Sequence, residues 1–298
     1  MDGVLVVDKP QGLTSHDVVA VARRSLHERR IGHTGTLDPL ATGVLPLACG
    51  RATRLVRFFM SSDKDYDATV RFGVSTDSYD MTGTATARSG LVPTSASVEA
   101  ALERLRGEYM QVPPAFSAKK IAGERAYAKA RRDEEVVLSP VCVRVTRAEV
   151  LELTGGSCRI AVTCSSGFYV RSFAHELGEM VGTGACLESL RRTRSGEFTI
   201  EQAVDLENLR RASTAVTERW IPIDRLLPGF PAFRLGSEGR KRVVHGQMVG
   251  RRDAVTAEDV RFDRPGTWVR LLDEEGQLIG LATVVPTGES LHPAIVLS

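Results

Sequence analysis

The stretch from His33 to Leu45 reads HTGTLDPLATGVL and carries a single carboxylate, Asp38. Its two glycines allow the backbone to turn tightly and to approach another molecule closely. Pro39 restricts Asp38 to an extended or turn conformation, and the apolar run at residues 44–48 leads into a buried element. An acid held on a rigid loop at the edge of a buried element is a candidate reactive site. An ordinary Asp–Pro turn explains the same dipeptide, so the loop alone does not decide the matter.

The composition is that of a folded protein without a membrane segment. A chain of 298 residues has room for one large domain, or for a large and a small one. Asp8 and Lys9 interrupt the apolar run Val4–Val7, which excludes a signal peptide, and no uncharged stretch is long enough to cross a bilayer. The five cysteines form no Cys-x-x-Cys pair, which predicts free thiols in a cytoplasmic protein.

The net charge of +2 does not demand a polyanionic partner, but the basic residues are clustered. Such clusters could form a face that neutralises phosphates, or could be scattered solvated helix faces, and charge alone favours neither. The clusters are Arg23-Arg24, Arg29-Arg30, Lys119-Lys120, Arg131-Arg132, Arg191-Arg192-Arg194, Arg210-Arg211, Arg240-Lys241-Arg242 and Arg251-Arg252.

Helical and strand patterns are interspersed along the chain. Because the later strands are separated only by short turns, we expect an α+β fold, with a mixed, largely antiparallel sheet and flanking helices. Period-two alternation and β-branched runs predict strands at residues 4–7, 65–73, 142–145, 147–153 and 159–164. Caps and helical spacing predict helices beginning after Thr14 or Ser15 and at Ser97, and at residues 51–58, 122–132, 172–181 and 205–212, with a polar loop at 77–90.

The best candidate linker is Leu227–Pro231, which contains two prolines and a glycine. It divides the chain into residues 1–228 and a small β-rich module at 229–298. Within this module, two strand patterns flank the turn Asp273–Gly276, a hairpin signal. A module of this size is near the lower limit for independent folding, so we expect it to pack on the first.

A second conspicuous stretch, SSGFYVRS at residues 165–172, lies where a strand ends and a helix begins. Arg171 could pair bidentately there with a carboxylate or phosphate, or could be an ordinary surface arginine. His175-Glu176 resembles the start of a zinc-protease motif, but Glu179 stands where the second histidine is needed, so we exclude zinc. The chain has neither a dinucleotide-binding glycine loop nor a phosphate-binding P-loop.

Together, six motifs in order along the chain resemble the TruB family of bacterial tRNA pseudouridine-55 synthases. The resemblance extends from the start of the chain to about Arg194, and the C-terminal module looks more faintly like a PUA-type RNA-binding domain. The motifs are Lys9-Pro10-x-Gly12-x-Thr14-Ser15, the stretch Gly32–Leu45, Asp63-Lys64-x-Tyr66, Val112-Pro113-Pro114-x-Phe116-Ser117-Ala118-x-Lys120, Gly167-x-Tyr169-Val170-Arg171-Ser172 and Leu190-Arg191-Arg192.

The resemblance implies a pseudouridine synthase fold and an isomerisation, in which a flipped-out uridine of the tRNA T loop exchanges its N-glycosidic bond for a C–C bond. Asp38 corresponds to the family's nucleophile, and whether it attacks uracil C6 or ribose C1′, or assists a glycal route, stays open. Arg171 would supply the opposing charge. Tyr66 would stack on the base, with its hydroxyl near C5.

The resemblance also implies a set of substrate contacts. It implies that the partner is the T stem-loop of tRNA and that the protein is a monomer without an obligate protein partner. It also implies that no metal, cofactor or membrane is involved. Tyr169 and Leu190 would pack the pocket, Lys9 would support it, and His33 would fill the space that the extruded nucleotide leaves. The basic residues nearest the motifs, expected to contact phosphate, are Lys119, Lys120, Arg191 and Arg192.

Two other classes of function compete with this enzyme. The first is a catalytically inactive binding module, or an enzyme that also helps tRNA to fold; the presence of Asp38, Tyr66 and Arg171 argues against an inactive relative. The second is a glycosidic-bond hydrolase. That class usually needs a second acid, and no second carboxylate accompanies Asp38 in its motif.

Overall fold

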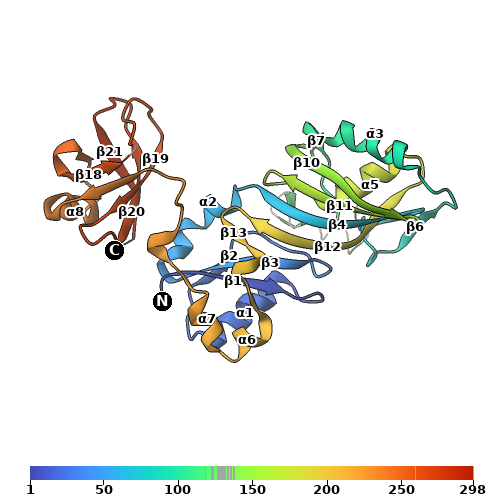
Figure 1. Cartoon of the computed structure of the whole chain (residues 1–298), viewed down its shortest axis with the longest axis horizontal. Coiled ribbons are helices and arrows are strands. Elements are labelled where there is room, and N and C mark those ends of the chain that lie inside the picture. The colour runs from blue at the N-terminus through green and yellow to red at the C-terminus, as the bar shows by residue number, and fades with distance from the viewer. Residues whose placement is uncertain are drawn as a thin grey trace.

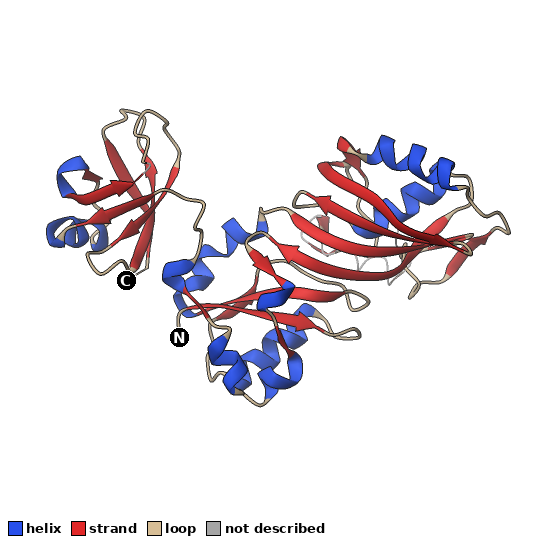
Figure 2. Cartoon of the chain, viewed as in Figure 1, coloured by secondary structure: helices blue, strands red, loops and turns tan. Residues whose placement is uncertain are grey.

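The computed structural model describes residues 1–117, 119–121, 124–125, 132, 134, 136, 138–258 and 260–297. Two sheets organise the chain, a long curved one and a smaller C-terminal one joined to it by a linker (Figure 1). Helices lie on the outside of both sheets (Figure 2). No described helix is long and apolar enough to cross a membrane.

The large sheet has eleven strands, in the spatial order β14-β1-β3-β12-β4-β11-β10-β7, with β13, β15 and β2 attached beside this path. Only the β1–β14 and β3–β12 pairings are parallel, so the predicted mixed, largely antiparallel sheet is confirmed. The strands are β1 Gly3–Lys9, β2 Ile31–His33, β3 Thr42–Cys49, β4 Lys64–Phe72, β7 Gly107–Gln111, β10 Val141–Thr154, β11 Ser157–Cys164, β12 Ala185–Ser195, β13 Phe198–Thr199, β14 Val204–Asp205 and β15 Ile221–Pro222.

Strand β1 shows why its sequence is apolar throughout rather than alternating. Leu5 and Val7 belong to the main core, whereas Val4 and Val6 belong to a second core on the opposite face. A strand that is buried on both faces needs apolar side chains at every position. The main core lies between the sheet and helices α1, α3 and α5, whose apolar stripes face it.

The helices begin at caps that the sequence only partly reveals. Thr14, one of the two predicted caps, caps α1 in a capping box with Asp17. The prediction that Ser97 caps the next helix is wrong, because Thr94 has the extended cap conformation and its side chain accepts from the amide of Ser97. The helices of this part are α1 Ser15–Ser25, α2 Val56–Met60, α3 Ser95–Leu105, α5 Val170–Met180, α6 Leu206–Arg210 and α7 Thr214–Glu218, with 3-10 turns at Gly50–Leu55, Ile200–Gln202 and Ile223–Arg225.

The structure differs from the strand and loop predictions at β10, β6 and β12. The strands expected at 142–145 and 147–153 are one strand, β10, because bulges shift its register at Val145/Arg147 and Val150/Glu152 and interrupt the alternation. The loop expected at 77–90 contains β6 (Ala85–Arg88), which pairs with β5 (Val74–Thr76). Strand β12 was not predicted, since two further register shifts and its basic run mask the pattern.

The helix expected at 122–132 falls mostly outside the described residues. Its described part includes Glu124–Arg125, which forms β9 and pairs with β8 (Lys120–Ile121). The helix prediction is therefore wrong at these two residues.

The C-terminal sheet has six strands in the order β17-β21-β20-β19-β16-β18. The predicted hairpin is confirmed: β19 and β20 pair antiparallel, and Gly276 has a φ of 83° in their turn. The elements are β16 Ala232–Leu235, α8 Ser237–Val244, β17 Val249–Gly250, the 3-10 turn Arg251–Asp253, β18 Ala254–Glu258, β19 Trp268–Leu272, β20 Leu278–Val284 and β21 Ser290–Val296.

The second core joins the two sheets. It combines residues of β1, β3 and α2 with Leu272, Leu281 and Leu297 of the C-terminal module. Phe58 of α2 meets Trp268 edge to face, with ring centroids 4.8 Å apart, and the Leu278 amide donates to Asp224 Oδ1 at 2.7 Å. The C-terminal module therefore packs on the first part through both apolar and polar contacts.

Candidate active site

The loop that carries Asp38 is fixed from two sides. Ser15, the first residue of α1, accepts from the amide of Leu37 at 2.8 Å and donates to its carbonyl at 3.1 Å. The amide of Gly12 donates to the carbonyl of Pro39 at 2.7 Å. These bonds on both neighbours of Asp38 fix its backbone, while its side chain stays 43% exposed.

Arg171 approaches Asp38 from the first turn of α5. Tyr169 precedes this helix in an extended conformation without a side-chain cap of its own. Gln111, at the end of β7, replaces the cap: its side chain accepts from the Tyr169 amide at 2.8 Å and donates to the Tyr169 carbonyl at 3.2 Å. Because Gln111 is fully buried, this pair of bonds sets where the helix begins and so where Arg171 points.

The Arg171 guanidinium joins two carboxylates. Its Nε lies 2.8 Å from Asp38 Oδ2 and 3.7 Å from Asp80 Oδ2. The Arg171 side chain is 7% exposed, and its Nη1 and Nη2 donate to the carbonyls of Ser78 and Phe116 at 3.1 and 2.9 Å. With most donors used by fixed acceptors, the guanidinium cannot swing away from Asp38.

Asp80 is the site residue that sequence reasoning missed. It lies in the segment predicted as a polar loop, and it is 5% exposed. A buried charge is rare without a partner, but burial at this position is not evident from its polar neighbours. The only sequence signal is a run of Ser and Thr around one aspartate, which is typical of a side-chain-bonded turn.

A cavity of about 290 Å³ opens in front of Asp38. Tyr66 from β4, Leu190 from β12 and Tyr169 line it with apolar surface, next to Asp38 and Arg171. Its volume is near the lower limit of about 300 Å³ for small-molecule pockets. The structure therefore brings together Asp38, Tyr66, Arg171, Tyr169 and Leu190.

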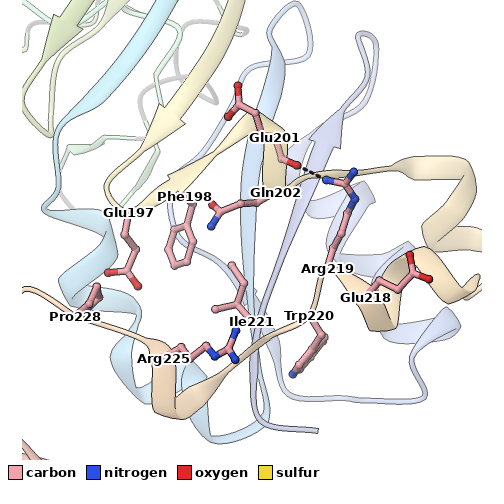
Figure 3. Close-up of a pocket in the computed structure, with 10 residues that line it drawn as sticks. All are labelled: Glu197, Phe198, Glu201, Gln202, Glu218, Arg219, Trp220, Ile221, Arg225 and Pro228. Atoms are coloured by element: carbon pink, nitrogen blue, oxygen red, sulfur yellow. Dashed lines mark hydrogen bonds between the residues drawn. The ribbon is translucent and has the colours of Figure 1, made fainter.

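A second hollow, of about 420 Å³, lies elsewhere, near the link to the C-terminal sheet (Figure 3). It is lined by glutamates, arginines and Trp220, and it contains none of the predicted site residues. The smaller cavity at Asp38 is therefore the candidate site, because it alone of the two combines the ion pair with aromatic walls.

Both tyrosines of the cavity are uncharged phenols near neutral pH. Burial raises the pKa of Tyr66, against the opposing effect of the Arg192 guanidinium. Burial likewise raises the pKa of Tyr169, against the opposing effect of the Arg171 guanidinium. Each ring can therefore offer an apolar face together with a neutral hydroxyl.

Two buried lysines stabilise the backbone around the site. Lys9 is fully buried and its Nζ donates to the carbonyls of Leu13 and Pro10 at 2.6 and 3.0 Å, so it supports the turn whose Gly12 binds Pro39. Lys64 holds the end of α2 by donating to the Met60 carbonyl at 2.7 Å. Burial lowers the pKa of each lysine to about 8.

Arg192 was predicted to contact phosphate, and this prediction needs correction. Arg192 is 1% exposed, and its guanidinium donates to the carbonyls of Val44, Gly35 and Thr36 at 2.7, 3.0 and 3.4 Å. It lines the cavity beside Tyr66, and its bonds hold the Asp38 loop to β12. Close contact with an RNA phosphate requires an accessible guanidinium, which the burial of this one excludes.

Replacing Arg192 by methionine is expected to destabilise the chain by about 2–4 kcal/mol, because three carbonyls lose their donor. Urea unfolding followed by circular dichroism measures this. Arg191→Met is the matched control: Arg191 is half-exposed and pairs with Asp8 at 2.7 Å, so its loss should cost at most about 1 kcal/mol. Equal losses in the two variants would contradict the buried role of Arg192.

The three other residues predicted to contact phosphate are Arg191, Lys119 and Lys120. Arg191 uses both terminal nitrogens on Asp8, at 2.7 and 3.1 Å, so its charge is already partnered. Lys119 follows closely on Ser117, which lines the cavity, and Lys120 is placed by its backbone in β8. The role of these lysines stays a prediction.

His33 lies in β2 beside the Asp38 loop. Its ring meets that of His16 edge to face, with centroids 5.2 Å apart, and its buried Nδ1 has no hydrogen-bond partner among the described residues. Burial lowers the pKa of His33 to about 4. The ring is therefore neutral near pH 7.

Glu176 lies one helical turn beyond Ser172, beneath the Gln111 cap. Its Oε2 accepts from the Tyr109 hydroxyl at 3.1 Å, and this hydroxyl accepts from Gln111 Nε2 at 3.1 Å. Burial raises the pKa of Glu176 to about 7, against the hydrogen bonds from Tyr109 and Gln111. The carboxyl group therefore changes charge near neutral pH, within the network that holds Tyr169.

The raised pKa of Glu176 predicts a pH-dependent stability. Because the folded chain keeps this proton to higher pH than the unfolded chain, the stabilisation is complete below about pH 4.5 and is lost as the pH rises through about 7. Glu176→Gln cannot titrate, so its stability relative to the parent should rise by about 1–2 kcal/mol between pH 5 and pH 8.

Urea unfolding at pH 5, 6, 7 and 8 measures this difference. Glu179→Gln, at an exposed position on the same helix, is the control and should run parallel to the parent. A constant difference between Glu176→Gln and the parent across this range would show that Glu176 does not titrate there.

His175-Glu176, the pair that resembles the start of a zinc-protease motif, lies in α5. Among the described residues, no group of three or more His, Cys, Asp or Glu side chains is arranged to hold a metal ion. His175 instead stacks on Tyr79, with ring centroids 4.0 Å apart and planes 5° from parallel.

Comparison with known proteins places the chain in a family. The N-terminal domain model of TruB family pseudouridylate synthases matches residues 23–170, and the model of the tRNA pseudouridylate synthase B C-terminal domain matches residues 171–228. The chain belongs to the TruB family. Asp38 and Tyr66 lie within the first match, and Arg171 and Leu190 lie within the second.

Individual relatives agree over the full length. The chain is 43% identical to tRNA pseudouridine synthase B of Solibacter usitatus over all of both chains. It is 36% identical to tRNA pseudouridine synthase B of Stutzerimonas stutzeri over 97% of this chain and 93% of the relative. In fold it is similar to a chain in the structure of an H/ACA RNP bound to a substrate RNA containing 2′-deoxyuridine, with a TM-score of 0.77, 23% identity and coverage of 99% and 85%.

Proposed function

We propose that the chain is a tRNA pseudouridine synthase that isomerises uridine 55 of the T loop, with Asp38 as the nucleophile. The observation that carries the proposal is the ion pair of Asp38 and Arg171, 2.8 Å long, at a cavity walled by Tyr66 and Tyr169. Family membership and relatives named tRNA pseudouridine synthase B support the substrate class.

The reaction breaks the bond between N1 of uracil and ribose C1′ and forms a bond between C5 and C1′. A proton leaves C5 and a proton is gained at N1, so the product is an isomer of the substrate. A uridine inside a folded RNA loop must be extruded before a side chain can reach it. The cavity in front of Asp38 is the place on this chain that would receive the base.

Asp38 is suited to act as a nucleophile because it is fixed and yet accessible. The bonds to Ser15 and Gly12 hold its backbone neighbours, and the ion pair with Arg171 Nε at 2.8 Å orients its carboxylate, the group that would act as nucleophile. Attack at uracil C6, attack at C1′ and a glycal route all begin from this placement. They differ in the atom that Asp38 touches first.

Tyr66 supplies a face for the base and a hydroxyl. Its ring lines the cavity from β4, and base stacking on an aromatic ring contributes about 1–3 kcal/mol. In the proposal its hydroxyl lies near C5, where the proton leaves. The raised pKa of Tyr66 keeps its hydroxyl protonated near neutral pH. The hydroxyl can therefore take up the C5 proton only if it passes its own proton to another acceptor in the same step.

A glycosidic-bond hydrolase is the main alternative, and the position of Asp80 bears on it. Such an enzyme needs a second carboxyl group that reaches the leaving group. Asp80 is a second carboxylate near Asp38, but it is 5% exposed and lies behind Arg171 rather than in the cavity wall. Its placement favours a role in orienting Arg171 over proton donation to a substrate.

The domain division is part of the proposal. Residues 1–228 would form the catalytic domain, and residues 229–298 a PUA-like RNA-binding domain. The separate six-stranded sheet supports this division, as do the exposed Arg251 and Arg252. Comparing the salt dependence of tRNA affinity between the parent and an Arg251→Ala, Arg252→Ala variant tests the RNA contact.

The product distinguishes the proposed isomerase from a hydrolase. The full chain is incubated with an unmodified tRNA transcript, and the RNA is then digested to nucleosides and separated by chromatography. We expect pseudouridine in place of one uridine per transcript, with no free uracil. Free uracil and an abasic site would assign the chain to the hydrolases, and an unchanged nucleoside content would leave only the binding module.

A further inference from the structure

The buried Asp80 depends on an unusual neighbour. Tyr79 adopts a left-handed backbone conformation with a φ of 62°, which residues other than glycine rarely adopt. Its amide donates to the Thr76 carbonyl at 3.3 Å, and its carbonyl accepts from the Leu187 amide of β12 at 2.9 Å. This turn directs the next residue, Asp80, toward Arg171.

The rest of the Asp80 loop, residues 76–82, encloses the carboxylate. Asp80 Oδ1 accepts from Ser78 Oγ and the Thr82 amide, each at 2.9 Å, and from Thr82 Oγ1 at 2.5 Å. The other oxygen, Oδ2, lies on the side of Arg171 Nε. The loop therefore sets the rotation of the carboxylate, but its backbone strain at Tyr79 has to be compensated elsewhere.

The compensation comes from α5, the helix that also carries Arg171. His175 lies four residues after Arg171, so both side chains are on the same face of the helix. Arg171 Nη1 donates to the Ser78 carbonyl at 3.1 Å, and the His175 ring stacks on Tyr79 at 4.0 Å. Two successive turns of α5 thus hold Ser78 and Tyr79, the two residues that directly precede Asp80.

We infer that His175 is a positioning residue: through its stack on Tyr79 it holds Asp80 against Arg171, and thereby holds Arg171 on Asp38. This inference rests on the proposed function, since the reaction is its readout. His175 Nδ1 is buried without a partner among the described residues, so its ring acts here through its face rather than through a hydrogen bond. His175 itself is absent from the wall of the cavity.

Kinetics with a labelled substrate test the inference. Tritium release from uracil C5 of a tRNA transcript is measured for the parent, His175→Ala, His175→Phe and Met180→Ala. We expect His175→Ala to lower kcat about fivefold to tenfold with little change in KM, from the loss of one ring pair. His175→Phe keeps a ring and should stay within about twofold of the parent. Met180→Ala, at an exposed position of the same helix, should match the parent.

A double-mutant cycle separates positioning from general packing. If His175 acts through Asp80, then adding His175→Ala to an Asp80→Asn variant should lower kcat by less than about twofold further. Equal fold-losses in both backgrounds, or a His175→Phe variant as slow as His175→Ala, would overturn the inference. No release by the parent would overturn the proposed function instead, whereas an active parent with an unchanged His175→Ala variant would overturn only the inference.

Discussion

Replacing Asp38 by asparagine is expected to abolish pseudouridine formation, lowering the single-turnover rate by about 10⁴-fold or more. Asparagine keeps the size and polarity of the side chain but is not a nucleophile, so no covalent or ion-assisted step can begin. Because Asp38 is 43% exposed, the change leaves the core untouched and tRNA binding should fall by less than about threefold. Tritium release and filter binding measure the two quantities.

Asp67→Asn is the matched control for this variant. Asp67 follows Tyr66 in β4 but points to the opposite face of the strand, where it pairs with Arg159. It should form pseudouridine at the parental rate. If instead Asp38→Asn still modifies tRNA, the nucleophile is misassigned; if it forms none but still accelerates tRNA folding, the chain has a folding activity besides catalysis.

Replacing Arg171 by methionine is expected to give the second largest loss, about 10³-fold in kcat. The variant removes the cation that Asp38 and Asp80 share, so Asp38 loses the hydrogen-bonding partner that orients its carboxylate. An electrostatic donor of this kind typically contributes about 10²–10³-fold or more to the rate. Tritium release under single-turnover conditions measures it, with circular dichroism as the check on folding.

Arg171→Lys refines the test. Lysine keeps the positive charge but cannot reach the Ser78 and Phe116 carbonyls together with the two carboxylates. We therefore expect an intermediate rate, about 10-fold to 10²-fold below the parent. A lysine variant with the parental rate would mean that charge alone matters and that the fixed fork geometry does not.

The sequence motifs predicted one part of this site but did not reveal another. Asp38, Tyr66 and Arg171 came from motif resemblance, and the structure has them around one cavity. Asp80 could not be predicted, because its neighbours read as a loop and its burial arises only when α5 and β12 close over it. Tertiary contacts, not local sequence, determine that environment.

Arg191 and Arg192 show how strand geometry decides the fate of a basic run. The run reads as one phosphate-binding cluster, but successive side chains of β12 point to opposite faces. Arg191 stays half-exposed beside Asp8, whereas Arg192 is buried at the base of the Asp38 cavity with its donors on loop carbonyls. Since β12 was not predicted as a strand, this division was not predictable either.

The fold itself was predictable where one pattern dominates. The apolar run of β1 and the alternation in β4 both gave correct strands, and the turn at Gly276 gave the C-terminal hairpin. The pattern failed in β10 and β12, whose bulges change the face of the side chains partway along the strand. A register shift is fixed by the partner strand, which a local pattern does not contain.

Mapping the modified nucleotide tests the central proposal most directly. The full chain is incubated with an unmodified tRNA transcript and, separately, with a transcript carrying cytidine at position 55, and carbodiimide-dependent stops of primer extension are located in each. The proposed function predicts one new stop, at position 55 of the T loop, which is absent from the cytidine transcript and from reactions with Asp38→Asn. Stops elsewhere, or the same stop with Asp38→Asn, would contradict it.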